Sequence, residues 1–196
     1  MKTVGVILAG GRATRMGGGD KGALMLGGQS LLARCIARLA PQVDGAVLNA
    51  NGDPARFAGY GLPVVADSVP GFVGPLAGVL AGMDWATQHG ADAVVSAAAD
   101  TPFFPEDLVT RLRAAGPLAL AATPDPVRKL NRHPTFGLWP VALREDLRAA
   151  LHGGLRKVVL WTDAHGAATA HFPVGEFDPF FNINTPEDLI AAEALL

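Results

Sequence analysis

Short apolar runs alternate along the chain with segments whose apolar residues recur at helical spacing. The short runs predict buried strands, and the spaced segments predict helices that pack on a sheet. We expect strands over residues 4–9, 45–48, 62–66, 93–99, 118–122, 136–139 and 169–173, and helices over 29–40, 75–89, 105–115, 142–151, 155–161 and 186–196. This alternation predicts an α/β domain with a mostly parallel sheet.

Several of the predicted helices carry start signals. Ser30 is suited to cap the helix of residues 29–40, and Pro105 with two following acidic residues opens the helix of 105–115. Thr185 precedes a proline and two acids in the order that a helix start prefers. The Gly/Pro-rich stretch 51–61 and the segment 124–134 show neither pattern, so we expect them to be mobile loops.

The composition bounds the possible functions. The chain has 196 residues, of which 49% are apolar and 17% charged, so it can bury the core of a single domain and is not a disordered chain. Sixteen basic residues against 18 acidic ones give a net charge of −2, which argues against a nucleic-acid-binding surface. Any anion that the protein binds must therefore be held by a local cluster of positive charge.

The cysteine content and the first apolar run bear on the compartment. Cys35 is the single cysteine and lies on an apolar helical stripe, so we expect a core residue and a reducing environment. The apolar run at the N-terminus is too short for a signal peptide, and no stretch of about 20 apolar residues is present. We expect a cytoplasmic protein with no membrane partner.

A glycine-rich loop with positive charge follows the first predicted strand. Residues 10–19 contain five glycines, and Arg12, Arg15 and Lys21 accompany them. Free N–H groups and the missing Cβ atoms let such a loop approach a phosphate, and the cations suit a triphosphate. The loop has neither the Gly-Lys-Ser/Thr of a P-loop nor the dinucleotide-binding glycine pattern. A flexible surface loop with incidental charge is the less favoured alternative.

Polar residues follow other predicted strands. Asp100 comes directly after the buried run 93–99 and is placed to hold Mg²⁺, which needs only one or two protein carboxylates; its alternative role is to cap the next turn. Asn49 and Asp67 also follow strands, where a ligand contact and a turn role both remain open. Asn182 and Asn184 precede the capped C-terminal helix.

Two basic clusters occur in the second half of the chain. One contains Arg128, Lys129, Arg132 and His133, and the other contains Arg156 and Lys157. The residues alone leave two interpretations open, an anion-binding region and an ordinary solvated surface.

Taken in order, the motifs resemble those of the molybdenum cofactor guanylyltransferases. That family belongs to the nucleotidyltransferase superfamily, which has a Rossmann-like, glycosyltransferase-A-type fold. The resemblance spans the whole chain and rests on Leu8-Ala9-Gly10-Gly11, Arg15-Met16-Gly17, Asp20-Lys21-Gly22, Asn49-Ala50-Asn51, Asp67-Ser68, Gly74-Pro75-Leu76-Ala77-Gly78, Asp100-Thr101-Pro102, His133-Pro134-Thr135 and Asn182-Ile183-Asn184-Thr185-Pro186-Glu187.

The resemblance implies a three-layer α/β sandwich that transfers GMP from GTP to molybdenum-molybdopterin and releases pyrophosphate. It implies one domain over residues 1–196, with 1–102 mainly binding nucleotide and 103–196 mainly binding the acceptor. It also implies Mg²⁺ as cofactor and cofactor-delivery or recipient molybdoenzyme proteins as partners. We expect the protein to be a monomer.

The resemblance also assigns roles to residues. Gly-Gly at positions 10 and 11 favours GTP, because relatives that transfer cytidylyl groups carry Ala-Gly there. The amides of Asn182 and Asn184 stand where the superfamily often has a metal-associated polar group, so either metal contact or acceptor orientation is possible. The implied catalytic residues are Arg15, Lys21 and Asp100, with Asp100 as metal ligand; the implied nucleotide-binding residues are Leu8, Ala9, Gly10, Gly11, Lys21, Asn49, Asp67 and Asp100; and the implied acceptor-binding residues are His133, Arg156, Lys157, Asn182 and Asn184.

Three other functions stay open. A molybdopterin cytidylyltransferase differs in the base pocket, and a nucleotidyltransferase for a sugar phosphate or an isoprenoid precursor differs in its acceptor. A catalytically silent nucleotide-binding scaffold or sensor is the alternative of another class. Such a scaffold has no need for Lys21 and Asp100 together, so their joint presence favours an enzyme.

Overall fold

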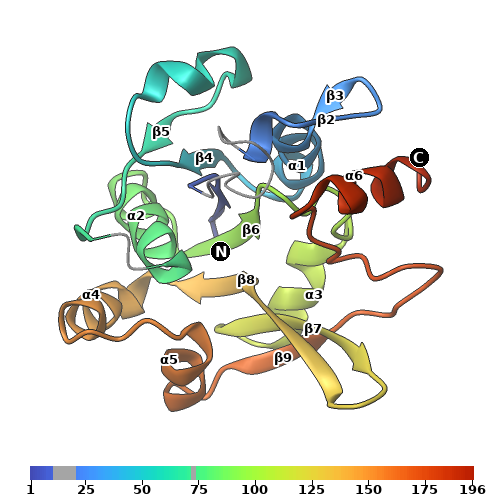
Figure 1. Ribbon diagram of the computed structural model, residues 1–196. Helices are drawn as coiled ribbons and strands as arrows, with labels where there is room; N and C mark the ends of the chain where they lie inside the picture. The colour runs from blue at the N-terminus through green and yellow to red at the C-terminus, as the bar shows by residue number, and fades with distance from the viewer. Residues whose placement is uncertain (11–20, 72–73) are drawn as a thin grey trace.

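A seven-stranded sheet forms the centre of the molecule, with the strand order β5-β4-β1-β6-β8-β7-β9 (Figure 1). The structure is a computed structural model, which describes residues 1–10, 21–71 and 74–196. The strands are β1 (Thr3–Leu8), β4 (Ala46–Asn49), β5 (Val64–Val65), β6 (Ala93–Ala98), β7 (Ala119–Asp125), β8 (Lys129–Pro140) and β9 (Ala168–His171). Strand β8 pairs antiparallel with β6 and β7, and the other pairings in the sheet are parallel. The predicted mostly parallel sheet is confirmed.

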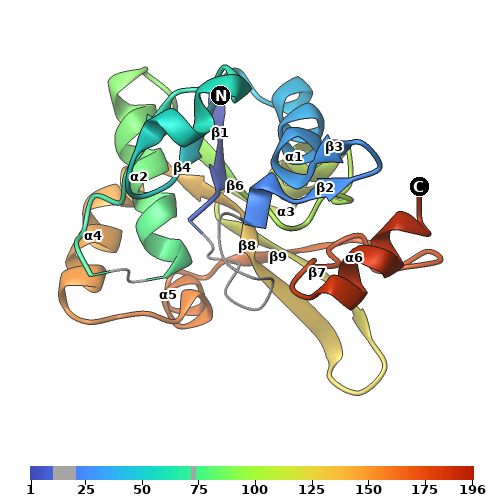
Figure 2. The same cartoon turned by 45° about the horizontal axis from the view of Figure 1, so that its top comes forward.

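Helices cover both faces of this sheet and make three layers (Figure 2). Alternate residues of β1 enter different cores: Ile7 packs with residues of α1 (Leu31–Leu39) and α3 (Leu108–Ala115), whereas Val4 and Val6 pack with α2 (Pro75–Gln88), α4 (Arg144–His152) and α5 (Val158–Ala164). A strand that is buried on both faces is apolar throughout. This explains why the sequence 4–9 reads as a continuous apolar run.

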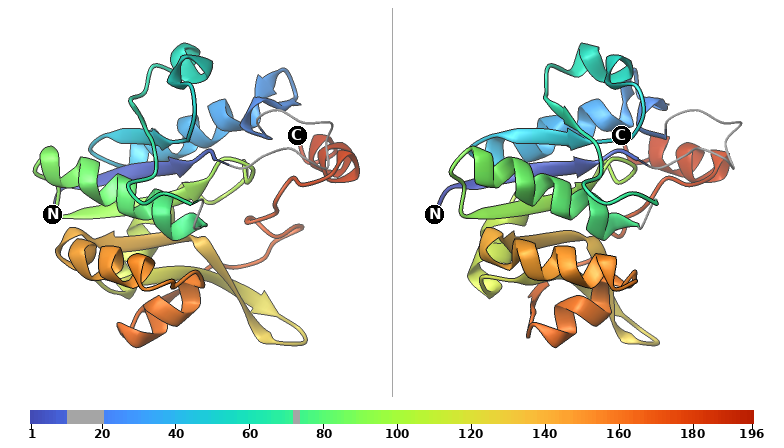
Figure 3. Two further views of the ribbon diagram at one scale, coloured as in Figure 1. Left: turned by 60° about the vertical axis from the view of Figure 1, so that its left-hand side comes forward. Right: turned by 90° about the vertical axis from the view of Figure 1, so that its left-hand side faces the viewer.

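A third, smaller core lies beyond the carboxyl ends of the strands. There α6 (Pro186–Glu193) packs near the hairpin of β2 (Met25–Leu26) and β3 (Gln29–Ser30), with Leu26 and Ile183 fully buried (Figure 3). Thr185 caps α6 through a reciprocal capping box with Asp188, as the start signal predicted. The short 3-10 helices are η2 (Lys21–Ala23), η3 (Ala40–Gln42), η4 (Pro54–Tyr60) and η5 (Val141–Leu143).

The structure corrects the two predicted loops. Residues 124–134 form the outer part of the β7–β8 hairpin, whose turn is held by Asp125 Oδ1 accepting the N–H groups of Val127 and Arg128. All residues of this part are exposed or half-buried, because the hairpin extends away from the rest of the sheet (Figure 1), so its sequence has no apolar run. Within 51–61, η4 is capped by Asp53, and its Phe57 is buried.

Smaller differences concern element ends. The predicted strand 136–139 is the last part of β8, and the predicted helix 155–161 begins at Val158 as α5. Ser30 caps α1 as expected, because its Oγ accepts the N–H of Ala33. Cys35 is a fully buried core residue, also as expected, and this burial raises the pKa of its thiol. In the part of the chain that the structure describes, no helix combines the length and the hydropathy needed to cross a membrane.

Candidate active site

A cavity of about 360 Å³ opens at the carboxyl edge of β1, β4 and β6. Six residues that the sequence analysis selected line it together, although they are far apart in the chain. The full lining is Leu8, Gly10, Asn49, Asn51, Asp67, Gly74, Pro75, Ala98, Asp100, Thr135 and Asn182. Ligands of parallel α/β sheets bind beyond the carboxyl ends of the strands, and this cavity is in that position.

The strand register explains why these residues meet. Leu8 pairs with Asn49 on one side and with Ala98 on the other, so three adjacent parallel strands end at the same level. Asp100 and Gly10 follow within two residues of those ends and therefore emerge at one edge. Gly11, Arg12 and Arg15 lie outside the described residues, so their predicted roles stay predictions.

Two asparagines hold Asp67 in a fixed orientation. The Nδ2 of Asn49 donates to Asp67 Oδ1 at 3.0 Å, and the Nδ2 of Asn51 donates to Asp67 Oδ2 at 2.8 Å. Asn51 also accepts the backbone N–H of Asp67 through its Oδ1, at 2.9 Å. A carboxylate has about four acceptor positions, so Asp67 keeps acceptor capacity for ligand N–H or O–H groups. Asn51 was not predicted as a site residue, although it lies two residues beyond Asn49 in the same motif.

Helix α2 approaches this polar cluster closely because it carries glycine at the contact. A Cβ atom at Gly78 would overlap Asn49 Oδ1 and lie 2.6 Å from Leu8 Cδ2. The same helix begins at the cavity, where Gly74 is the N-cap with φ 86° and Pro75 is the first helical residue. Its partially positive N-terminus favours an anionic ligand there.

We expect Gly78→Ala to weaken binding of the nucleotide that the resemblance implies about tenfold or more and to destabilise the fold by about 1–3 kcal/mol, because the added methyl must displace Asn49 or Leu8. Calorimetric titration with GTP and urea denaturation measure the two effects. Gly175→Ala is the matched control, since a Cβ there meets nothing within 4 Å. A wild-type Kd for GTP in the Gly78 variant would contradict this role for the close contact.

Asp100 lines the same cavity, and the side chain of Lys21 lies beside it. The Nζ of Lys21 lies 3.4 Å from Asp100 Oδ2 and donates to Asn184 Oδ1 at 2.6 Å. Their side chains are 18% and 22% exposed, so the pair is shielded but still reachable by a ligand. Three distant segments therefore converge here, namely η2, the end of β6 and the segment before α6.

Backbone and hydroxyl contacts fix the two asparagines before α6. The N–H of Ile183 donates to the carbonyl of Asp100 at 2.9 Å, and the buried Ile183 anchors the segment in the third core. Thr101 Oγ1 donates to Asn182 Oδ1 and lies 3.3 Å from Asp100 Oδ1. Because the amide oxygens of Asn182 and Asn184 already accept hydrogen bonds, their NH₂ groups are left as donors for an anionic ligand.

His133 lines a neighbouring cavity that shares residues with the first one. Its Nε2 is 2.9 Å from Thr123 Oγ1, and its ring stacks on Phe180 with 4.3 Å between the centroids. Burial lowers the pKa of His133, while the nearby Asp178 acts in the opposite direction. The hydrogen bond and the stacking fix the plane of the ring. The lowered pKa keeps the imidazole mainly neutral at neutral pH.

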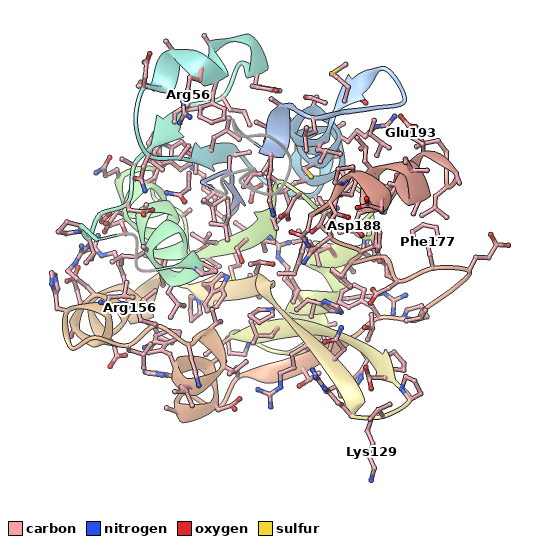
Figure 4. All side chains as sticks on the ribbon, in the orientation of Figure 1. Arg56, Lys129, Arg156, Phe177, Asp188 and Glu193 are labelled. Atoms are coloured by element: carbon pink, nitrogen blue, oxygen red, sulfur yellow. The ribbon has the colours of Figure 1, made fainter. Side chains whose placement is uncertain are left out.

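The structure does not bring the remaining selected residues into either cavity. The side chain of Ala9 is 4% exposed and packs in the core. Arg156 lies in the α4–α5 connection (Figure 4), where its Nη1 donates to the carbonyls of Leu151 and Leu155, and Lys157 precedes α5. Among the described contacts, the Arg156 side chain therefore serves the connection between α4 and α5, and neither Arg156 nor Lys157 lines one of the two cavities.

A cavity at the carboxyl edge of a mostly parallel sheet, with a Lys–Asp pair beside it, is the arrangement that the sequence motifs predicted for a nucleotidyltransferase. A model of the MobA-like NTP transferase domain matches residues 5–167. The molybdenum cofactor guanylyltransferase of Bradyrhizobium sp. (strain ORS 278) is 56% identical over 199 residues, which cover 97% of this chain and 92% of that protein. The chain belongs to the molybdenum cofactor guanylyltransferase family, as the motifs predicted.

Solved structures support the same fold. The molybdopterin-guanine dinucleotide biosynthesis protein A of Archaeoglobus fulgidus superposes with a TM-score of 0.71 at 25% identity, covering 98% of this chain and 97% of that one. The 4-diphosphocytidyl-2C-methyl-D-erythritol synthase of Anaerococcus prevotii DSM 20548 gives 0.75 at 15% identity, covering 99% and 95%. Both superpositions cover nearly the whole chain, so the predicted fold class is confirmed.

Proposed function

We propose that this protein transfers the guanylyl group of GTP to the terminal phosphate of molybdenum-molybdopterin, releasing pyrophosphate and forming the guanine dinucleotide of the cofactor. The observation that carries the proposal is the cavity lined by both the Asn49–Asp67 cluster and Asp100, which pairs with Lys21. The cluster offers acceptors for a base or ribose, and the Lys21–Asp100 pair offers charge for phosphates and a metal ion. Membership of the guanylyltransferase family supports GTP as the donor.

The chain's own residues contribute by orientation and charge. In the proposed reaction an acceptor phosphate oxygen attacks the α-phosphorus and pyrophosphate leaves, so one P–O bond forms and one breaks. The nucleophile is already an anion, so no protein nucleophile is needed, and alignment and charge neutralisation supply the rate. Lys21 Nζ and the NH₂ group of Asn182 face the phosphates in this proposal, while Asp67 accepts from guanine or ribose.

Asp100 fits a Mg²⁺ ion that is held mainly by substrate. Magnesium takes one or two protein carboxylates and fills other positions with phosphate oxygens and water. Among the described residues no group of three or more His, Cys, Asp or Glu side chains forms a metal site, so we propose a site that takes few ligands from the protein, with Asp100 as one of them. When bound, the ion would neutralise phosphate charge and polarise the α-phosphate.

We propose that the two halves of the chain bind different substrates. Residues 1–102 would bind mainly nucleotide and 103–196 mainly acceptor, within one domain. Among the acceptor candidates His133, Asn182 and Asn184 lie at or beside the cavities, whereas Arg156 caps backbone carbonyls. We further propose that the protein acts as a cytoplasmic monomer and passes its product to a delivery protein or recipient molybdoenzyme.

Product analysis tests the proposed function directly. The protein is incubated with Mg²⁺, molybdenum-molybdopterin and equal GTP and CTP, and the products are identified by mass. We expect the guanine dinucleotide and an equivalent of pyrophosphate. The cytosine dinucleotide as main product would identify a cytidylyltransferase, and nucleotide binding without any pyrophosphate release would indicate a silent scaffold; either result overturns the proposal.

We expect Gly10→Ala to lower kcat/KM for GTP about tenfold or more, while the fold is unchanged. A Cβ at Gly10 meets no protein atom within 4 Å, but Gly10 lines the cavity, so the methyl group would occupy space left for the nucleotide. A tenfold loss in kcat/KM corresponds to about 1.4 kcal/mol of lost binding or transition-state stabilisation. Steady-state kinetics with GTP and CTP measure the change, and Gly59→Ala, also in open space, is the control. An unaltered GTP-to-CTP ratio would show that Gly10 does not influence base choice.

A further inference from the structure

A second cavity of about 340 Å³ adjoins the first one and shares Thr135 and Asn182 with it. Thr135 lies where β8 departs from regular pairing, because the register between β7 and β8 shifts from Leu120–Gly137 to Ala121–His133. The irregular stretch of β8 therefore forms part of both walls. A ligand that fills the second cavity can extend a phosphate across Thr135 and Asn182 into the first one.

The second cavity has one flat aromatic wall. His133 stacks on Phe180, which is 3% exposed and packs edge-on against Phe136 and Phe172. The hydrogen bond between His133 Nε2 and Thr123 Oγ1 fixes the plane of the His133 ring. A planar heteroaromatic ring gains dispersion and stacking energy on a rigid wall of this kind.

A carboxylate with free acceptor capacity lies beside that wall. Asp178 Oδ1 accepts the N–H of Phe180 at 2.8 Å, whereas its Oδ2 has, among the described residues, only a weak contact of 3.5 Å with Thr123 Oγ1. No Lys or Arg of the described part of the chain forms an ion pair with Asp178. A carboxylate of this kind suits two adjacent N–H donors, such as those of an aminopyrimidinone edge.

We infer that this second cavity holds the pterin ring of the acceptor, with Asp178 accepting hydrogen bonds from its 2-amino and N3–H groups. The ring lies against His133, which Phe180 supports from behind, and its phosphate reaches toward Asn182. The inference rests on the proposed function, because that function supplies a pterin phosphate as substrate. Guanine has the same donor edge, so the structure offers two acids for two similar rings, Asp67 for the nucleotide and Asp178 for the pterin.

Fluorescence titration with neopterin monophosphate, an intrinsically fluorescent pterin phosphate, tests the assignment. We expect Asp178→Asn to raise the Kd of this probe at least tenfold and to leave the Kd of GTP within twofold of wild type. Asp67→Asn should do the reverse. An asparagine Oδ1 can still accept the N–H of Phe180, and Asp178→Ser, whose hydroxyl can cap the same turn, is the second variant. Glu176→Gln removes an exposed acid two residues away and is the charge-matched control.

Each outcome separates the two proposals. A wild-type protein that does not bind the probe, a wild-type Kd in both Asp178 variants, or an equal effect of Glu176→Gln overturns the pterin assignment. An equal rise in the Kd of GTP overturns it too, because Asp178 would then serve both ligands or the fold. If wild type forms the dinucleotide and Asp178→Asn keeps its acceptor KM, the assignment falls while the function stands. If wild type forms no product from GTP, the proposed function falls.

Discussion

Asp100→Ala is expected to lower kcat by about 10²–10³-fold or more, which is the usual effect of removing one preorganised charged group from an active site. The substitution takes away the carboxylate that faces Lys21 and that would bind Mg²⁺. It leaves the fold in place, because Asp100 is held to Ile183 through its backbone carbonyl. Pyrophosphate release measured across a Mg²⁺ titration, with circular dichroism of each variant, gives the comparison.

The control for this prediction lies at the other end of the same strand. Asp92 precedes β6 and accepts the backbone N–H of Lys2, far from the cavity at the carboxyl edge. Asp92→Ala removes the same charge and should keep wild-type kcat and Mg²⁺ dependence. Asp100→Asn keeps the side-chain size and should remain impaired. If Asp100→Ala shows an unchanged Mg²⁺ titration, Asp100 has no role in holding the ion.

The central part of the fold follows from local sequence. Strands 4–9 and 93–99 are apolar on both faces, and helix 75–89 is limited by a proline at its start, so each pattern admits one interpretation. The β7–β8 hairpin was harder to predict. Strand β8 begins at Lys129 in a stretch that contains Pro134 and several charges, and this first part pairs with β7 alone, whereas the end of β8 also pairs with β6.

The same contrast holds for the active site. Asn49, Asp67 and Asp100 could be selected because each follows a strand, and parallel strands place such residues at one edge. Asn51 and Gly78 could not be assigned roles in this way, because their roles depend on contacts between segments. Gly78 matters only because α2 crosses over Asn49.

Charge alone was a poor guide to the acceptor region. The pair at 156–157 suggested an anion site, but Arg156 donates to carbonyls near the end of α4, a role that many arginines at helix ends perform. Asp178 gave no signal in the sequence, since an acid does not suggest an anionic acceptor. Its position beside the aromatic wall emerges only when β7, β8 and the segment before α6 are brought together.

Lys21→Ala is expected to lower kcat by about 10²-fold or more, with a smaller rise in the KM for GTP. The ammonium group is the donor to Asn184 and the charge partner of Asp100, so its loss leaves a shielded carboxylate without its cation. Negative charge on the phosphates would then meet Asp100 unopposed. Single-turnover rates with GTP and acceptor, compared with calorimetric binding of GTP, separate the catalytic effect from the binding effect.

Two further variants isolate the charge from the rest of the side chain. Lys21→Met keeps most of the aliphatic length and should be as slow as Lys21→Ala if the ammonium group carries the effect. Lys129→Ala removes an equal charge from the tip of the β7–β8 hairpin (Figure 4) and should keep the wild-type rate. A folded Lys21→Ala protein with a wild-type single-turnover rate would exclude Lys21 from the mechanism. The contacts of Lys21 with Asp100 and Asn184 would then serve the structure of the protein and not its transition state.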